Sequence, residues 1–236
     1  MKLTPLKTIT IIQPILEEAH LEHILIRYFI AGPFEVMTYL LADLESGEAM
    51  VIDPAGRLEE IKQIVESNSL EVKLVVATHG HVDHILELKG FQSAFGSKAA
   101  MHDLDHRLLK EGYDSLFGDI SEFKELAINH YLEDNQIIYL GKHPIKVLHT
   151  PGHTPGSVCL LIENNIFTGD TLFVGAVGRT DLKGGSFETL LDSIKRKILP
   201  LPDETIVWPG HDYGDTPTST IGRERQENPY ITDFLL

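Results

Sequence analysis

The chain has 236 residues, 42% of them hydrophobic and 23% charged, a composition typical of a folded globular protein and not of a disordered or collagen-like chain. Its 20 basic and 35 acidic residues give a net charge of −15 at pH 7, which argues against binding to the phosphate backbone of nucleic acids. The single cysteine, Cys159, excludes an intrachain disulfide and a thiolate-rich zinc site, and its apolar neighbours place it in the predicted core.

Nothing in the sequence predicts export or membrane insertion. No run of about 18 apolar residues is present. The apolar stretch near the N-terminus is interrupted by Gln13, Pro14 and Glu17 and has no small-residue cleavage site behind it, which argues against a signal peptide. Together with the single cysteine, these features predict a cytoplasmic protein without a membrane partner. The sequence indicates no oligomeric state.

Residues 1–33 form an N-terminal lead-in. Residues 8–12 are compatible with a strand. Apolar residues recur at helical spacing at Leu21, Ile24, Leu25 and Tyr28. Two β-rich runs at 36–42 and 49–52 then flank a short polar stretch with a late glycine, a pattern that predicts a β-hairpin.

Helices and strands alternate in the middle of the chain. Apolar residues at helical spacing predict a helix over 58–67, and the continuous apolar run 72–77 is typical of a strand buried on both faces. A second helix is predicted over 85–95 and a short strand at 99–101. The mixed pattern of 103–132 predicts a helix and a long loop, which we interpret as an excursion or lid.

Strands dominate the second half. The β-rich runs lie at 136–140, 145–149, 158–162, 166–168 and 205–208. One helix is predicted over 187–198 with Ser186 as its N-cap, and a short docking helix in the tail 221–236. Without repeats or linkers, residues 1–236 are predicted to form one domain. The interleaved hairpins and helices favour an α/β (α+β) fold in which two sheets carry helices outside them.

Potential metal ligands follow four of the predicted strands. They are His79, His81, Asp83 and His84 after the first of these strands, then His153, Asp170 and His211. Imidazole and carboxylate groups without a thiolate suit zinc, iron or manganese. Seven ligands exceed the four of one tetrahedral site, so the economical interpretation is two adjacent metal ions that share a bridging carboxylate.

Five motifs in this order resemble the metallo-β-lactamase-fold hydrolases, and within them the glyoxalase II (hydroxyacylglutathione hydrolase) branch. The motifs are THGHVDH at 78–84, PGHTPGS at 151–157, GDTLF at 169–173, GRTD at 178–181 and PGHDYG at 209–214. The resemblance covers about residues 34–230. It implies a four-layer αββα sandwich of two mixed β-sheets with the metal ions at one rim, in a short form without the C-terminal helical domain of that branch.

The resemblance also implies a role for each ligand. One metal ion is expected at His79, His81 and His153, the other at Asp83, His84 and His211, with Asp170 bridging the two. Zinc is the expected metal, with iron or manganese as possibilities. Asp53, in the VIDPAG segment, is expected to support the ligand loop by hydrogen bonding.

Such a centre predicts hydrolysis of a thioester, S-2-hydroxyacylglutathione or a similar small molecule. Two cations lower the pKa of a shared water, and the hydroxide formed attacks the carbonyl carbon without a protein nucleophile. Asp83 and Asp170 are the predicted catalytic carboxylates of this centre.

The expected substrate contacts are less complete than the ligand set. Arg179 and Tyr213 match the family positions that hold the glutathione moiety, whereas Asp181 stands where the family has an aromatic residue. Arg223 and Arg225 are possible substitutes for the cationic contacts of the family, and pairing with neighbouring glutamates is the alternative for both.

Other functions fit part of the same pattern. The GRTD and HDYG motifs also resemble persulfide dioxygenases, in which a single iron would be held here by His79, His153 and Asp170. A hydrolase acting on another substrate, such as a lactam or phosphoester, and a non-catalytic metal-binding module are the remaining alternatives.

Overall fold

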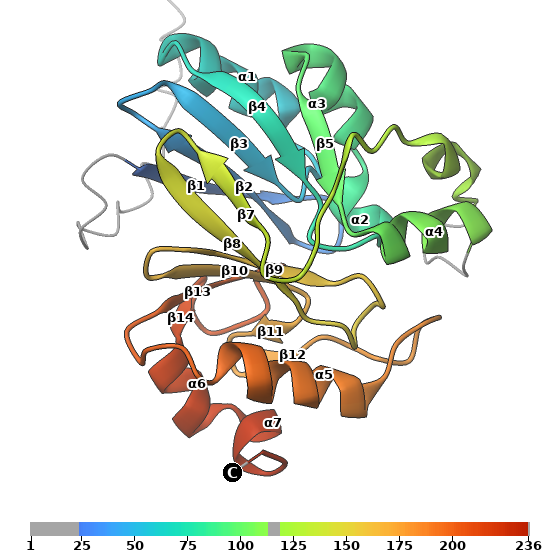
Figure 1. Cartoon of the computed structure of the whole chain (residues 1–236), viewed down its shortest axis with the longest axis vertical. Helices are drawn as coiled ribbons and strands as arrows, with labels where there is room; N and C mark the ends of the chain where they lie inside the picture. Colours follow the sequence, from blue (N-terminus) through green and yellow to red (C-terminus); the bar gives the residue numbers. More distant parts are fainter. Residues whose placement is uncertain (1–23, 113–118, 236) are drawn as a thin grey trace, which may run out of the picture.

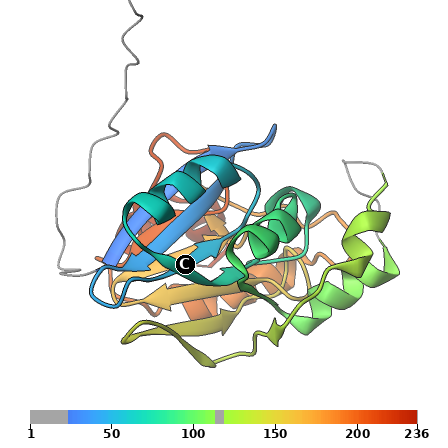
Figure 2. The same ribbon diagram turned by 90° about the horizontal axis from the view of Figure 1, so that it is seen from above.

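Two six-stranded β-sheets lie face to face, with helices on the outer face of each (Figure 1). This computed structural model describes residues 24–112 and 119–235. Seen from above, in Figure 2, the helices of the first half lie over one sheet and the orange helix of the second half lies beyond the other. The four layers are therefore helix, sheet, sheet and helix, as the sequence predicts.

The first sheet contains the strands of the N-terminal half in chain order. Its strands are β1 (Ile24–Ala31), β2 (Val36–Asp43), β3 (Glu48–Ile52), β4 (Glu71–Val76), β5 (Lys98–Met101) and β6 (His130–Tyr131). The first three pair antiparallel and the last four pair parallel, so the sheet is mixed. Parallel pairing requires crossovers, which α1 (Leu58–Ser67) and α3 (Leu88–Phe95) provide on the outer face.

The second sheet has the order β14-β13-β10-β9-β8-β7. Its strands are β7 (Ile137–Leu140), β8 (His143–His149), β9 (Val158–Ile162), β10 (Asn165–Gly169), β13 (Ile206–Pro209) and β14 (Ser219–Thr220). Neighbours pair antiparallel except β10 and β13, which run parallel. A small hairpin of β11 (Leu172–Phe173) and β12 (Ala176–Val177) follows β10.

The remaining helices are short. They are α2 (Val82–Ile85), α4 (Asp103–Glu111), the 3-10 helix η1 (Ser121–Glu125), α5 (Phe187–Ser193), the π-helical turn η2 (Ile194–Ile198), α6 (Ile221–Glu227) and α7 (Pro229–Thr232). The Ser186 side chain accepts a hydrogen bond from the backbone N–H of Thr189, which caps α5 as predicted. No helix of the described residues is long and apolar enough to cross a membrane.

Three apolar layers hold the sandwich together. Along β2, Leu40 and Ala42 pack toward α1 and α3, whereas Tyr39 and Leu41 face the second sheet. This period of two is the geometry of a strand, and β2 is buried throughout because both of its faces are covered. The third layer, which includes Cys159, lies between the second sheet and α5.

One predicted helix is wrong. Ile24, Leu25 and Tyr28 belong to strand β1, and Leu21 and residues 8–12 lie outside the described residues. Ile24 and Tyr28 pack in the layer between the sheets, whereas Leu25 packs on the outer layer. Because β1 has apolar side chains on both faces, its apolar residues happen to recur at helical spacing, and this led to the wrong prediction.

Two further segments differ from the prediction. The helix predicted over 85–95 is divided into α2 and α3 where the backbone N–H of Glu87 donates to the carbonyl of Pro54 rather than within a helix. In the predicted excursion, Ile120, Phe123 and Leu126 are buried in the apolar layer between the first sheet and its outer helices. This part of the segment therefore belongs to the core.

Candidate metal centre

All seven predicted ligands lie where strands end, at one edge of the sandwich. His79 and His81 follow β4 of the first sheet and lead into α2, which carries Asp83 and His84. The other ligands follow β8, β10 and β13, which run in one direction in the second sheet, so their carboxyl ends meet at one edge. The fold therefore brings together side chains that are more than 130 positions apart in the sequence.

Backbone hydrogen bonds join the two sheets beside these ligands. The N–H of Val158 donates to the carbonyl of Thr78 over 2.9 Å, and the N–H of Met37 donates to the carbonyl of Gly210 over 2.8 Å. Within the second sheet, the N–H of Gly210 donates to the carbonyl of Gly169. The ligand loops are thus held by their backbones as well as by the strands.

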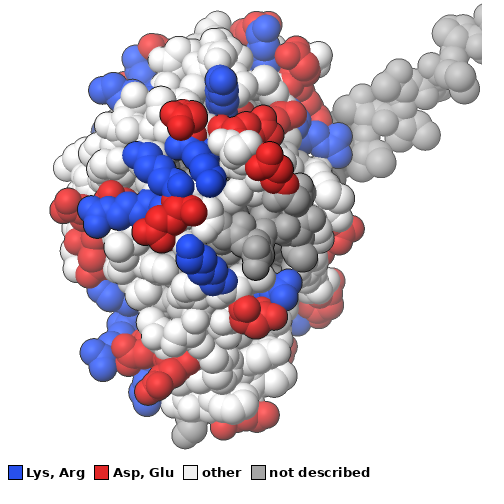
Figure 3. All heavy atoms as spheres, turned by 90° about the vertical axis from the view of Figure 1, so that its right-hand side faces the viewer, with Lys and Arg blue, Asp and Glu red and all other residues white. Residues whose placement is uncertain are grey.

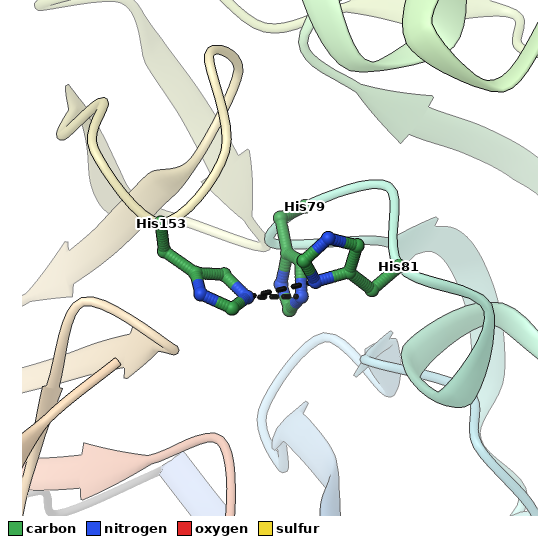
Figure 4. Close-up of side chains that lie close together, drawn as sticks. All are labelled: His79, His81 and His153. Carbon is green, nitrogen blue, oxygen red and sulfur yellow. Dashed lines mark hydrogen bonds between the residues drawn. The ribbon is translucent and has the colours of Figure 1, made fainter. Parts of the chain in front are cut away.

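Three buried histidines form what we call the first trio (His79, His81 and His153). Their rings point toward one another from two loops (Figure 4). The distance from His81 Nδ1 to His153 Nε2 is 2.8 Å, and that from His153 Nε2 to His79 Nε2 is 3.2 Å. One potential ligand atom of each residue lies within 4.8 Å of the others.

The second trio consists of Asp83, His84 and His211. The Nε2 atoms of the two histidines are 3.1 Å apart, and Asp83 Oδ2 lies 3.7 Å from His211 Nε2 and 3.9 Å from His84 Nε2. Both histidines are buried, whereas 18% of the Asp83 side chain is exposed.

Asp170 lies between the two trios. Its Oδ2 is 3.4 Å from Nε2 of both His153 and His211, and its Oδ1 is 3.3 Å from Nε2 of His84. Oδ1 is buried and accepts no hydrogen bond from the described residues. One carboxylate therefore reaches both trios.

Hydrogen bonds on the outer side of the rings assign the histidine tautomers. Nδ1 of His153 donates to the carbonyl of Arg179 over 2.7 Å, and Nδ1 of His211 donates to the carbonyl of Phe34 over 2.6 Å. Each Nε2 therefore presents a lone pair to the interior of the cluster. Both Nε2 atoms lie 3.4 Å from Oδ2 of Asp170. Acceptors placed this close repel one another unless a cation lies between them, so this donor set fits divalent metal ions.

Asp53 supports the ligands that follow β4. Its Oδ1 accepts from the backbone N–H of Thr78 over 2.7 Å. Its Oδ2 accepts from the Thr78 hydroxyl over 2.8 Å and from Nδ1 of His84 over 2.9 Å. The backbone of Asp53 has a φ of 50°, in the left-handed region that few residues other than glycine adopt.

Burial and neighbouring charges set the protonation of the cluster. Burial lowers the pKa of His79 and His81 well below the ordinary value, and neighbouring histidines add to this effect. Burial also opposes charge on His84, but Asp170 and other carboxylates outweigh it and raise its pKa. For Asp170, burial is outweighed by the surrounding histidines, which hold the pKa of its carboxyl well below the usual range. Asp170 is therefore ionised and His79 and His81 are neutral, which are the forms that bind metal, whereas His84 favours its charged form among the carboxylates.

The two predicted substrate residues flank the cluster on different sides. Tyr213 stacks on His211 with ring centroids 4.5 Å apart, and 53% of Tyr213 is exposed. Its hydroxyl donates to the carbonyl of Phe34, and partial burial together with nearby carboxylates raises its pKa to about 12. Arg179 lies beside His153, but its guanidinium donates two hydrogen bonds, of 2.7 and 2.8 Å, to the carboxylate of Asp181.

The other two arginines lie in α6, and both have acidic partners. Arg223 pairs with Asp215 and with Glu227. Arg225 pairs with Asp203 and donates to backbone carbonyls, including that of Leu199. Pairing with a neighbouring glutamate, the alternative considered, is therefore found for Arg223, whereas the acidic partner of Arg225 is the distant Asp203.

Sequence reasoning missed two residues that contact the ligand loops. The Thr78 hydroxyl lies 3.1 Å from Nδ1 of His79, and the Asp105 carboxylate accepts three hydrogen bonds from the loops of the first trio. Thr78 could have been predicted from the sequence, because it is the first residue of the THGHVDH motif. Asp105 was not, because an acidic residue in the first turn of a helix is a common exposed feature.

The chain matches the metallo-beta-lactamase superfamily over residues 31–211. Hydroxyacylglutathione hydrolase GloC of Haemophilus influenzae is 35% identical over 191 residues, which make up 78% of this chain and 87% of that protein. The mitochondrial persulfide dioxygenase ETHE1 of Bos taurus is 35% identical over 198 residues, 83% of this chain and 71% of that protein.

Solved structures agree with the sequence comparison. The B3 metallo-beta-lactamase BLEG-1 superposes with a TM-score of 0.78 at 33% identity, covering 88% of this chain and all of that one. TTHA1623, solved in a di-iron-bound form, superposes with a TM-score of 0.72 at 30% identity, covering 86% of this chain and 99% of that one. With the shared fold and the family match over most of its length, the chain belongs to the metallo-beta-lactamase superfamily.

Proposed function

We propose that the protein is a metal-dependent hydrolase with a two-metal centre that cleaves S-2-hydroxyacylglutathione or the thioester of a similar thiol. The observation that carries this proposal is the position of Asp170, whose oxygens lie 3.3 to 3.4 Å from ring nitrogens of both trios. A shared carboxylate is how two-metal hydrolytic sites hold their ions close together. The similarity to a hydroxyacylglutathione hydrolase supports the substrate class.

The first trio would hold one cation and the second trio the other, with Asp170 binding both. Nitrogen and oxygen donors without a thiolate suit zinc, and they also accept iron or manganese. The di-iron form of a similar structure supports that wider choice. When bound, the two cations supply a water of lowered pKa and polarise the carbonyl oxygen of the substrate.

Asp83 and Asp170 are the proposed catalytic carboxylates. Asp170 would bind both cations and so set the distance between the trios, because it is buried and lies 3.4 Å from Nε2 of His153 and of His211. Asp83 is partly exposed, and we assign to it the proton of the attacking water. The water oxygen adds to the acyl carbon, the carbon–sulfur bond breaks, and the thiolate leaves without needing a strong acid.

The chain offers a poor alternative nucleophile in Cys159. Its side chain is fully buried in the layer under α5, and burial raises the pKa of the thiol to about 11. A thiol in this state is neither ionised at neutral pH nor accessible to a substrate. This supports attack by water over a covalent acyl intermediate on cysteine.

Tyr213 and Arg179 are the proposed substrate contacts, one beside each trio. Tyr213 stays protonated at neutral pH, so its hydroxyl remains a hydrogen-bond donor. The distribution of surface charge also favours a small-molecule substrate over a nucleic acid. On the face that Figure 3 shows, basic side chains stand beside acidic ones rather than forming a continuous basic surface among the described residues.

A persulfide dioxygenase is the second candidate function, favoured by the similarity to ETHE1 of Bos taurus. Its single iron would use His79, His153 and Asp170. These residues also converge, since His153 Nε2 lies 3.2 Å from His79 Nε2 and 3.4 Å from Asp170 Oδ2.

Metal analysis followed by paired assays separates the two functions. The protein is purified without added metal, its metal content is measured, and it is assayed for S-lactoylglutathione hydrolysis and for oxygen uptake with glutathione persulfide. We expect about two metal ions per chain and thioester hydrolysis. One iron per chain with oxygen uptake would replace the proposal by the dioxygenase. Hydrolysis of a β-lactam alone would reject the thioester substrate.

A further inference from the structure

Asp105 connects the two loops that carry the first trio. It lies in the first turn of α4 and its side chain is completely buried. Its Oδ2 accepts from the backbone N–H of Gly80 and from the hydroxyl of Thr154, both over 2.7 Å. Its Oδ1 accepts from the backbone N–H of Gly156 over 2.6 Å. Gly80 separates the two histidines of one loop, and Thr154 directly follows the histidine of the other.

The three partners require a carboxylate in particular. Two of them are backbone N–H groups, which can only donate, and they approach different oxygens of Asp105. A carboxylate offers an acceptor on both sides, whereas an amide offers one acceptor and one donor. An Asp105→Asn substitution therefore places an NH₂ group against a backbone N–H in either orientation of the amide.

The first turn of α4 also contacts both loops closely. A Cβ atom added to Gly156 would lie 2.6 Å from Asp105 Oδ1 and 2.8 Å from the Asp105 backbone nitrogen. A Cβ added to Gly80 would lie 3.1 Å from the Asp105 Cβ. The loop backbones can approach the helix only because both positions are glycine, so the contact is tight and leaves little freedom to shift.

These contacts span the two sheets. The loop with Gly80 follows β4 of the first sheet, and the loop with Thr154 follows β8 of the second. The ligand atoms that meet across this junction are His81 Nδ1 and His153 Nε2, 2.8 Å apart. Their separation depends on how the two loops are held relative to one another, and Asp105 binds both loops.

We propose that Asp105 is a positioning residue that sets the separation of the two histidine loops and thereby the affinity of the first trio for a divalent cation. The assignment rests on the proposed metal centre and is independent of the substrate. Asp53 supports the second trio in the same way, because its carboxylate accepts from Nδ1 of His84. Partners that hold ligands in place commonly change metal affinity by 10- to 100-fold when they are replaced.

The test is a Co²⁺ titration of the metal-free protein, followed by the visible absorption of the bound ion. For Asp105→Asn we expect the dissociation constant of the first-trio ion to rise at least about 10-fold, with an altered spectrum. The matched control is Asp103→Asn, a partly exposed aspartate in the same turn that pairs with Arg107. It should bind Co²⁺ within about twofold of the wild type. Unchanged affinity and spectrum in Asp105→Asn would overturn the assignment.

A second pair of variants covers the case in which Asp105→Asn does not fold. Thr154→Val removes the hydroxyl that donates to Asp105, and Thr154→Ser retains it. We expect weaker Co²⁺ binding in the valine variant and recovery in the serine variant. A valine variant that is less stable to urea but binds Co²⁺ normally would show a purely structural role and reject the proposal. A wild-type protein that binds no Co²⁺ would reject the metal centre itself, and the assignment with it.

Discussion

The metal centre and the rim around it carry their charges in opposite ways. In the centre, Asp170 is buried among imidazoles, and only 8% of the residue is exposed to solvent. At the rim, Arg179 and Asp181 are both exposed and neutralise one another. A buried charge must be compensated by fixed neighbours, whereas an exposed pair is screened by solvent and contributes little. Substitutions in the centre should therefore have much larger effects than substitutions at the rim.

Asp170→Ala should give the largest effect, because it removes the carboxylate that reaches both trios. We expect fewer metal ions per chain and a loss of turnover of at least about 100-fold on whichever substrate proves active. Metal analysis and kcat on the same preparation check this, with circular dichroism to confirm the fold. An unchanged ratio of metal to protein would refute the bridging role.

Asp53→Asn should give the next largest effect, acting on the second trio. The amide cannot accept from all of its donors, which include Nδ1 of His84 and the N–H of Thr78. Metal affinity should fall by about 10- to 100-fold, measured by competition with a chelator. Asp43→Asn is the control. Asp43 is also buried and accepts from the N–H of Glu45, but it lies at the end of β2 that is far from the metal centre. That variant should retain its metal affinity even if its stability falls.

His102 lies between these extremes, because it is only partly buried. Its ring stacks on His149 with centroids 4.2 Å apart, and burial, reinforced by His149, lowers its pKa to about 4. The unfolded chain therefore binds the proton first, and the free energy of unfolding should fall as the pH falls from about 6.5 to 4.

The His102→Asn variant isolates this contribution, since asparagine still caps α4 but does not titrate. The loss of stability between pH 7 and pH 4.5 should be smaller in the variant by about 1 kcal/mol, a value reduced for solvent screening. Urea unfolding at both pH values measures it. Equal losses in the two proteins would mean that His102 titrates normally in the folded state.

Asp181→Ala should give the smallest effect, at the rim. Removal of Asp181 releases the Arg179 guanidinium, so the dissociation constant of glutathione should fall, by no more than about fivefold. Calorimetric titration measures it. Asp192→Ala, which frees Arg196 of a comparable exposed pair, is the control and should have no effect. Tighter binding in both variants would point to net charge rather than to Arg179.

The sequence predicted most of the fold because its signals are local. Alternating and continuous apolar runs identified the strands from β2 to β5 and most of the second sheet, and Ser186 marked the start of α5. The prediction of secondary structure was wrong in two segments, where contacts with distant parts of the chain override the local pattern of apolar residues. Strand β1 has apolar side chains on both faces, and the helix predicted over 85–95 is divided by a hydrogen bond from Glu87 to a distant carbonyl.

The sequence by itself also identified the candidate ligands, since histidines and aspartates at strand ends and in short motifs are recognisable without coordinates. Only the tertiary structure decided which other residues hold the loops of these histidines and aspartates in place. The contacts of Asp105 with Gly80 and Gly156 join segments 25 and 51 positions apart. Such contacts depend on how two sheets pack, and packing is a property of the whole sandwich rather than of any one segment.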